Sequence, residues 1–162
     1  MKIEEGKFYF IKDSFFNLVN EKDLCLNNKA GNKRPCYYCF KESDESSIIW
    51  FLPISSKVEK YKRIYNEKKE KYRRVDNIVF GYVEGEERAF LIQNMFPTTK
   101  EYIEEKYVRQ SKDVSVSARL KCELQKKAKR ILKLVEKGYR NLVFPDIIKI
   151  KSILLNRTKN SQ

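Results

Sequence analysis

Four short runs rich in aromatic and β-branched residues constrain the fold most, because they occur as two closely spaced pairs. The first pair spans residues 34–40 and 48–54, and the second spans residues 78–83 and 88–93. The two links, 41–47 and 84–87, are polar and short. Strands joined by such links pair antiparallel. The sequence therefore predicts two β-hairpins.

Helical periodicity accounts for most of the remaining apolar residues. Apolar side chains step by three or four from Val116 to Val135, which predicts a long helix that ends near Gly138. The same spacing over residues 57–72 predicts an amphipathic helix that lies against the sheet with a basic outer face. A last helix is expected over residues 146–156, with Pro145 in its first turn.

The flanking segments complete the expected element order. A first strand over residues 7–12 precedes a short helix, for which Asp13 is the expected N-cap. Residues 27–32 are a predicted loop, and Thr99 ends the second strand of the second hairpin and can cap the next segment. A further short strand is expected over residues 107–109.

Antiparallel hairpins backed by helices predict an α+β protein built on a small half-open antiparallel β-barrel, with a long helix in its C-terminal half. No repeat or linker interrupts the 162 residues, so residues 1–157 are expected to form one domain and residues 158–162 a frayed tail. No run approaches the roughly eighteen apolar residues that span a bilayer, and no export signal precedes the first strand. A cytoplasmic protein without a membrane partner is expected.

The positive charge lies in two segments. The net charge is +13; residues 57–74 carry nine basic and three acidic residues, residues 119–140 carry nine and two, and the remainder holds 17 of each sign. Clustered Lys and Arg release counterions from phosphates, so the pattern favours a nucleic-acid footprint. The alternative is two helices with ordinary solvated basic faces. A membrane-bound helix is disfavoured, because the apolar stripe of residues 57–74 is largely tyrosine.

Histidine is absent, which removes imidazole acid–base pairs and His-ligated metal sites from the possible chemistry. Cys36 and Cys39 have the spacing of a zinc ligand pair, but residues three apart on a strand point to opposite faces, and no second pair completes a site. We interpret them, with Cys25 and Cys122, as reduced cysteines that pack. No metal or cofactor is expected.

Residues 53–57, Pro-Ile-Ser-Ser-Lys, stand between a buried strand and a basic helix. Helix N-terminal amides, the hydroxyls of Ser55 and Ser56 and the ammonium group of Lys57 all stabilise negative charge, so the segment suits a phosphate. Simple capping of the helix is the alternative. Residues 32–35 place two cations at a strand entrance, and residues 93–99 place amides and hydroxyls at a strand end; surface turns are the alternative for both.

At these segments the chain resembles the endoribonuclease toxins of type III toxin–antitoxin systems, the ToxN/AbiQ group, and most closely their TenpN/CptN branch. The resemblance rests on residues 33–35 (Lys-Arg-Pro), 50–61 (Trp-Phe-Leu-Pro-Ile-Ser-Ser-Lys-Val-Glu-Lys-Tyr) and 91–97 (Leu-Ile-Gln-Asn-Met-Phe-Pro). One departure is that Val58 and Glu59 follow Lys57, where distant ToxN members carry further lysines.

The resemblance implies a MazF/CcdB-like barrel fold and metal-independent cleavage of substrate RNA. It also implies inhibition by an antitoxin RNA, a pseudoknot-like folded repeat that forms a closed hetero-oligomer with the toxin. Phage defence and plasmid or genome maintenance both stay open as biological roles. Without histidine, the expected reaction is attack of a ribose 2′-hydroxyl on its phosphate, giving 2′,3′-cyclic phosphate and 5′-hydroxyl ends.

We assign the catalytic roles to four residues as hypotheses. Ser55 and Ser56 would hydrogen-bond the phosphate, while Lys57 and Lys33 would stabilise the developing charge. Crowding of Lys33, Arg34 and Lys57 would lower a lysine pKa toward the range of a general base. The expected RNA-binding residues are Arg34, Lys60, Tyr61, Arg63, Lys68, Lys71, Arg73, Arg74, Asn94 and Thr98.

Two functions of other classes remain as alternatives. A non-catalytic RNA-binding module would use the same basic helices with tyrosines that stack on bases. A DNA-binding regulator is disfavoured, because no helix-turn-helix pattern occurs.

Overall fold

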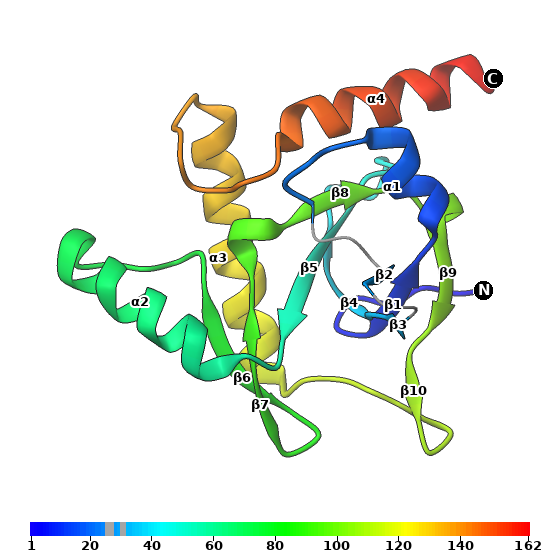
Figure 1. The fold of residues 1–162 in the computed structure, drawn as a ribbon. Helices are drawn as coiled ribbons and strands as arrows, with labels where there is room; N and C mark the ends of the chain where they lie inside the picture. The colour runs from blue at the N-terminus through cyan, green and yellow to red at the C-terminus, as the bar shows by residue number, and fades with distance from the viewer. Residues whose placement is uncertain (25–27, 30–31) are drawn as a thin grey trace.

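An antiparallel sheet of seven strands forms the centre of the computed structural model, which describes residues 1–24, 28–29 and 32–162 (Figure 1). The strand order is β6-β7-β5-β4-β1-β9, and β8 also pairs with β5. The bounds are β1 Phe8–Ile11, β4 Cys36–Lys41, β5 Ile49–Ser55, β6 Val79–Val83, β7 Glu86–Phe90, β8 Phe96–Thr98 and β9 Ile103–Lys106. Two small hairpins lie apart, β2 Asn28–Lys29 with β3 Asn32–Lys33 and β10 Val108–Arg109 with β11 Lys112–Asp113.

Both predicted hairpins are confirmed. In the first, β4 pairs with β5 so that Tyr37 lies opposite Leu52. In the second, β6 pairs with β7 and the turn is only Glu84-Gly85, shorter than the predicted link. Both turn residues have positive φ, 51° at Glu84 and 80° at Gly85. Two successive residues with positive φ are typical of the two-residue hairpin turn whose twist matches the right-handed twist of the flanking strands.

The α+β class and the antiparallel sheet are confirmed, but the sheet is not closed into a barrel. Strands β6 and β9 stand at the two ends of the strand order and do not pair with each other. Helices cover the sheet instead, with α3 packed on β4 and α4 packed on β8 (Figure 1). The helix bounds are α1 Asp13–Val19, α2 Val58–Tyr72, α3 Ala118–Glu136 and α4 Ile147–Asn160.

The helix ends refine the sequence-based boundaries. Lys12, not Asp13, is the N-cap of α1. The Ser117 hydroxyl accepts a hydrogen bond from the Leu120 amide and so caps α3, and the Asp146 carboxylate caps α4 through the Lys149 amide. Pro145 thus precedes the cap, and α4 continues past the expected end at residue 156 to Asn160. Among the described helices, none is both long and apolar enough to cross a membrane.

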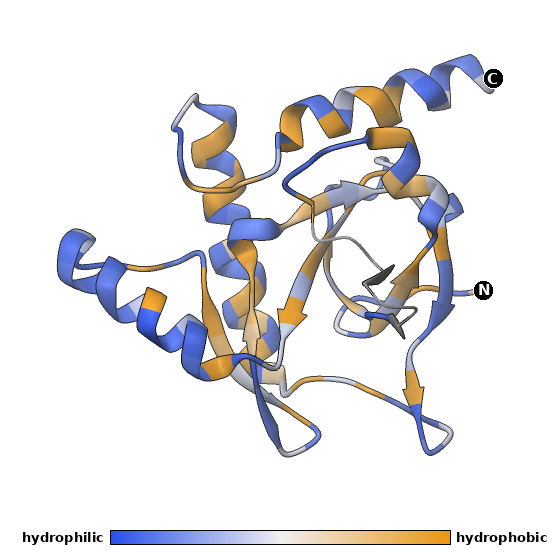
Figure 2. Ribbon diagram, viewed as in Figure 1, coloured by the Kyte–Doolittle hydropathy of each residue, from blue (hydrophilic) through white to orange (hydrophobic). Residues whose placement is uncertain are grey.

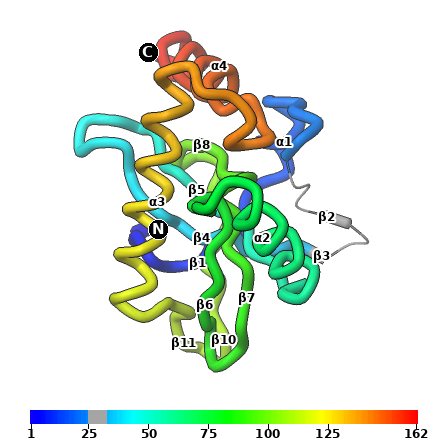
Figure 3. The backbone as a smooth tube through the Cα atoms, turned by 90° about the vertical axis from the view of Figure 1, so that its left-hand side faces the viewer, coloured from blue at the N-terminus to red at the C-terminus, as the bar shows by residue number. Residues whose placement is uncertain are grey.

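The helix α2 is present where predicted, but it does not lie flat against the sheet. It contains no buried residue, and its surface is mostly hydrophilic (Figure 2). It contacts the β6–β7 hairpin through Tyr65, whose ring lies edge-on to Phe80 with 5.7 Å between centroids, and through Lys62, which pairs with Glu87 at 2.6 Å. The helix therefore projects from the body of the molecule (Figure 1), and in the view from that side it lies in front of the sheet (Figure 3).

The segment after β7 differs most from the sequence-based expectation. The strand ends at Phe90, a 3₁₀ turn (η1, Ile92–Asn94) follows, and β8 then runs back along β5. Thr99 precedes a second 3₁₀ turn (η2, Lys100–Tyr102), but its side chain makes no cap. Strand β9 was not predicted, because two of its four residues are exposed glutamates.

The predicted loop over residues 27–32 lies partly outside the described residues, as does Cys25. Within this loop, residues 28–29 pair with residues 32–33 as the β2–β3 hairpin. Cys36 and Cys39 are both buried on β4, as expected of packing residues, and burial raises the pKa of the Cys39 thiol. Cys122 is exposed on α3.

Aromatic side chains dominate the core. The ring of Phe51 on β5 stacks on Tyr38 at 5.5 Å between centroids and on Phe96 at 6.1 Å. Phe15 from α1 meets the opposite side of Phe96 at 5.5 Å. Buried aromatic rings remove large apolar areas from water, so this stack fixes β8 and α1 against β5.

Close contact between α3 and β6 generates a stability prediction at Gly81. A Cβ atom at this position would clash with a methyl carbon of Leu120, which is itself buried. We expect Gly81→Ala to destabilise the protein by about 1–3 kcal/mol, because overpacking forces a buried neighbour to move. Urea unfolding measures the change. The double variant Gly81→Ala/Leu120→Ala should show a coupling energy that offsets part of the two single losses, and strict additivity would contradict the predicted contact.

Candidate functional site

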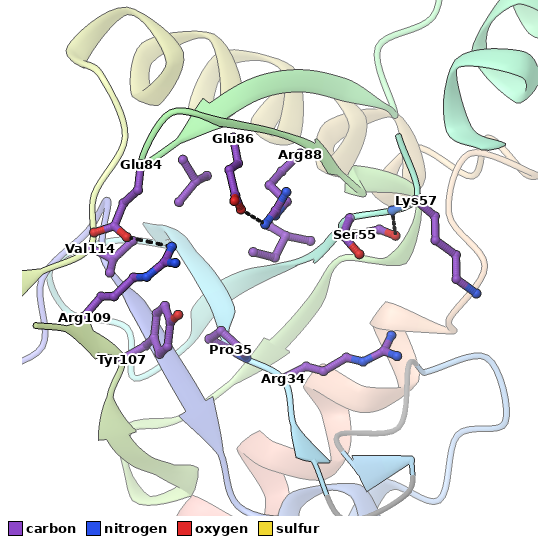
Figure 4. A pocket seen from close by; sticks show the side chains of 13 residues that line it. Arg34, Pro35, Ser55, Lys57, Glu84, Glu86, Arg88, Tyr107, Arg109 and Val114 are labelled. Carbon is purple, nitrogen blue, oxygen red and sulfur yellow. Dashed lines mark hydrogen bonds and ion pairs between the residues drawn. The ribbon is translucent and has the colours of Figure 1, made fainter. Parts of the chain in front are cut away.

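A surface pocket of about 280 Å³ lies where β5 ends, β4 begins and two hairpins approach each other (Figure 4). The β6–β7 hairpin forms one wall, and the segment at β10 forms another. The pocket brings together residues 34–35, residues 54–57 and residues 107–114, which are far apart in the sequence. Its polar and charged lining residues are Arg34, Ser55, Ser56, Lys57, Glu84, Glu86, Arg88, Tyr107 and Arg109.

Ser55, Ser56 and Lys57 form the junction between β5 and α2. Ser55 is still paired in the sheet, opposite Ala89 on β7, which holds the junction on a rigid support. Its hydroxyl accepts a hydrogen bond from the Lys57 amide at 3.1 Å, and the Ser56 carbonyl accepts one from the Val58 amide at 2.9 Å. These two amides are therefore engaged locally. The exposed side chains of Ser56 and Lys57 remain available.

Arg34 and Pro35 form the opposite rim at the entrance to β4. Pro35 fixes the backbone dihedral before the strand begins, and Arg34 is exposed. Figure 4 shows the side chains of Arg34 and Lys57 extending toward the same side of the pocket, away from Tyr107 and Arg109. The two cations can thus contact one extended anionic ligand.

Two arginines of the pocket were missed by sequence reasoning, and each is held by a glutamate. Arg88 on β7 pairs with Glu86, and Arg109 on β10 pairs with Glu84 at 3.2 Å. The second pair connects the tips of two hairpins across the pocket (Figure 4). Tyr107 was expected only as a strand residue; its ring packs edge-on against Phe10 at 5.7 Å. Side chains alternate between the two faces of a strand, so the sequence of residues 86–90 places Arg88 on one face of β7. No pattern in the neighbouring sequence indicates that this face lies next to Ser55 and Ser56.

Lys33 lies outside this pocket. Its ammonium group pairs with the Glu104 carboxylate of β9, and that hydrogen bond raises the Lys33 pKa. The expectation that neighbouring cations lower a lysine pKa is therefore wrong for Lys33, because the hydrogen bond to Glu104 has the largest effect on that pKa. A lysine held protonated in this way is a poor general base.

The expected RNA-binding residues occupy different environments. Lys60, Arg63 and Lys71 are exposed on α2, and Arg73 ends the helix with a positive φ of 63°. Tyr61 is half-buried on the same helix. Of the ten expected residues, only Arg34 lines the pocket. The residues that do not belong to α2, namely Arg74, Asn94 and Thr98, and Lys68 near the end of that helix, have surroundings of their own.

Three of these residues are either buried or paired within the protein. Thr98 is fully buried on β8, so its side chain cannot reach a surface ligand, which corrects the expectation for this residue. Lys68 donates a hydrogen bond to the Gln93 amide oxygen at 2.9 Å, and burial lowers its pKa. Arg74 pairs with Asp76 at 2.7 Å. Asn94 is half-buried in η1.

The pocket has the composition of an anion site. Four cationic side chains, Arg34, Lys57, Arg88 and Arg109, outnumber two carboxylates, and both carboxylates are paired. Arginine forks and hydroxyls bind phosphate oxygens with directional hydrogen bonds. The arrangement can hold a phosphodiester and stabilise charge that develops on it.

Comparisons with known proteins establish the fold. No protein-family model and no curated protein sequence matches the chain. Among solved structures, AbiQ matches with a TM-score of 0.71 at 13% sequence identity, over 94% of this chain and 98% of that one; it is described as a lactococcal anti-phage endoribonuclease of the type III toxin–antitoxin system. A second match, with a TM-score of 0.61 at 13% identity over 98% of both chains, comes from work on selective inhibition of a bacterial type III toxin by a non-coding RNA pseudoknot.

The Glu86–Arg88 pair leads to a prediction about anion binding. A bound oxyanion must compete with Glu86 for Arg88, so Glu86→Gln should tighten sulfate binding by up to about fivefold, because an exposed ion pair is worth roughly 0.2–1 kcal/mol. Calorimetric titration with sulfate measures the change. Glu136→Gln, at the exposed end of α3, is the matched control and should leave the affinity unchanged. Equal tightening in the control would show that net charge alone is responsible.

Proposed function

We propose that the protein is a metal-independent endoribonuclease toxin of a type III toxin–antitoxin system. The fold shared with AbiQ over nearly the whole of both chains supports this assignment. The single observation that carries it is the pocket, in which two hydroxyls and four cations converge at the end of a buried strand. Fold alone does not specify chemistry, whereas this set of side chains suits a phosphodiester.

The proposed reaction is an internal transfer at phosphorus. The ribose 2′-oxygen forms a bond to the adjacent phosphorus, and the bond from phosphorus to the 5′-oxygen of the next nucleotide breaks. One proton leaves the 2′-hydroxyl and one arrives at the departing 5′-oxygen, so the products are a 2′,3′-cyclic phosphate and a 5′-hydroxyl. The enzyme's contribution is to orient the strand and to stabilise charge on the phosphoryl oxygens.

Five residues of the pocket, and Lys33 outside it, have a proposed part in that reaction. Ser56 and Lys57 contact the scissile phosphate, and Ser55 positions Lys57 through the hydrogen bond to its amide. Arg34 holds a neighbouring phosphate on the opposite rim. Arg88 joins the phosphate-binding groups once the phosphate replaces Glu86. Lys33 acts at a distance, as one of the cations near the entrance to β4.

The proposed partners are substrate RNA in the cytoplasm and an antitoxin RNA. The second structural match supports the antitoxin, because the toxin described there is inhibited by an RNA pseudoknot. A folded repeat RNA bound between toxin copies would give the closed hetero-oligomer. Membership of the TenpN/CptN branch and the division into one domain over residues 1–157 stay predictions.

Cleavage with a chelator present tests the reaction directly. We expect the purified protein to cleave labelled RNA in excess EDTA and to leave cyclic phosphate ends, because the chain contains no histidine and its pocket supplies arginine, lysine and serine. Mass spectrometry of the fragments identifies the ends. RNA binding without any cleavage would favour the alternative, a non-catalytic RNA-binding module.

Substitutions at Ser56 and Lys57 test the site. Each residue is expected to contribute a few kcal/mol to transition-state stabilisation, so Ser56→Ala and Lys57→Ala should each slow cleavage about a hundredfold or more. Both should also relieve growth inhibition in cells that express the protein.

The controls separate catalysis from folding. Both side chains are exposed, so urea unfolding should show little loss of stability. Ser43→Ala and Lys149→Ala change equally exposed residues outside the pocket and should cleave at the wild-type rate. If the Ser56 and Lys57 variants also cleave at that rate, the site is wrongly assigned.

A further inference from the structure

A second cationic surface lies between the C-terminal end of α2 and α3, and it shares no lining residue with the pocket. It consists of two adjoining hollows of about 660 Å³ and 460 Å³, which meet at Arg74 and Arg130. The first runs along α3, and the second is closed by residues 140–142. We call the two together the α2–α3 groove.

Both basic segments of the sequence contribute cationic side chains to the groove. Arg119, Lys126 and Arg130 fall on one face of α3, at helical spacing, and the distance from the first to the last is about 16 Å at 1.5 Å per residue. Arg74 reaches this face from the end of α2, and Arg140 lies at the far end of the groove. Glu123 also lines this hollow and pairs with Lys127 at 2.9 Å, which leaves the row of Arg119, Lys126 and Arg130 cationic. Such a row matches a chain of phosphates better than a single anion.

Asp76 holds the two arginines where the hollows meet. Its carboxylate lies 2.7 Å from Arg74 Nε and 3.8 Å from Arg130 Nε. The Asp76 side chain is only 11% exposed, whereas the side chains of Arg74 and Arg130 remain 59% and 49% exposed. A buried carboxylate thus orients two guanidinium groups that still face solvent, which lowers the entropy lost when they bind a ligand.

The second hollow has an apolar floor and a polar rim. Val75 and Ile131 form buried parts of the floor, and Tyr72 stands at the rim with 63% of its surface exposed. The amide of Asn77 is fixed by a hydrogen bond to the Leu142 carbonyl at 3.1 Å. An aromatic ring beside an apolar recess and arginines is the combination that holds an unpaired base between phosphate contacts.

We propose that the α2–α3 groove binds a single strand of RNA, with its phosphates along α3 and one unpaired base in the hollow beside Tyr72. The proposal rests on RNA as the ligand of the proposed function, but it assigns the binding to a surface separate from the cleavage pocket. The β6–β7 hairpin provides a wall of the pocket, while residues 74–77, which lead into β6, line the groove. The two surfaces therefore lie at opposite ends of β6.

A binding measurement with RNA that cannot be cleaved tests the proposal independently of activity. The probe is a labelled twelve-nucleotide RNA of mixed sequence in which every 2′-hydroxyl is methylated, and fluorescence anisotropy gives its affinity at several salt concentrations. We expect Lys126→Glu/Arg130→Glu to weaken binding at least tenfold and to flatten the dependence on salt, because fewer counterions are released. Lys149→Glu/Lys159→Glu on α4 changes the net charge equally and should stay within about twofold of wild type.

A second pair of variants tests the base-binding hollow. Tyr72→Ala should weaken binding about tenfold, and Tyr72→Phe should restore it, because stacking requires the ring and not the hydroxyl. Tyr72 is exposed, so thermal unfolding should be unchanged in both variants.

The outcomes separate this proposal from the proposed function. If the α3 and α4 double variants weaken binding equally, or if Tyr72→Ala binds like Tyr72→Phe, the groove is not the binding surface. A wild-type protein that binds this probe through the groove but cleaves no unmodified RNA would uphold the groove and overturn the endoribonuclease assignment.

Discussion

Strand β5 is the element on which the rest of the structure depends. It pairs with β4, β7 and β8, and its residues from Ile49 to Pro53 are buried. Phe51 anchors the aromatic stack that joins β8 to the sheet. A strand fixed on both edges and both faces has little freedom to move, so the residues at its end, Ser55 and those that follow, emerge at a fixed place. The pocket is therefore held rigidly by the centre of the sheet.

Carboxylates organise the positive charge of this protein at three separate places. Glu86 and Glu84 hold Arg88 and Arg109 at the pocket, Asp76 holds two arginines in the α2–α3 groove, and Glu104 holds Lys33. Exposed ion pairs contribute at most about 1 kcal/mol each to stability. Their main effect is geometric, because each pair limits the rotamers of a long cationic side chain. Phosphates can then meet guanidinium groups that are already oriented.

The separation of the pocket from the groove has a functional consequence. In the proposed function, cleavage requires a strand to pass the serines at the end of β5, whereas affinity can come from cations on α3 and at the end of α2. The contact between Gly81 and Leu120 allows α3 to approach β6 closely and so places that row of cations next to the sheet. A folded RNA that covers both surfaces would hold the protein tightly and block the pocket at once. A short substrate would meet only one of them.

The sequence by itself determined the elements that have strong local signals. Apolar residues that recur every two positions predict both hairpins, and apolar residues that recur every three or four positions predict α3. Counting charges along the chain locates the two basic segments. All these signals depend only on neighbouring residues. Ser55, Ser56, Lys57 and Arg34 were also correctly grouped, since each stands at the end or entrance of a recognisable strand. Tertiary structure alone decided that Arg88, Arg109 and Tyr107 join them, that Lys33 is turned toward Glu104, and that Thr98 is buried. It also decided that α2 projects from the sheet and that the sheet stays open. These features arise from contacts between residues distant in the chain, which no local pattern encodes.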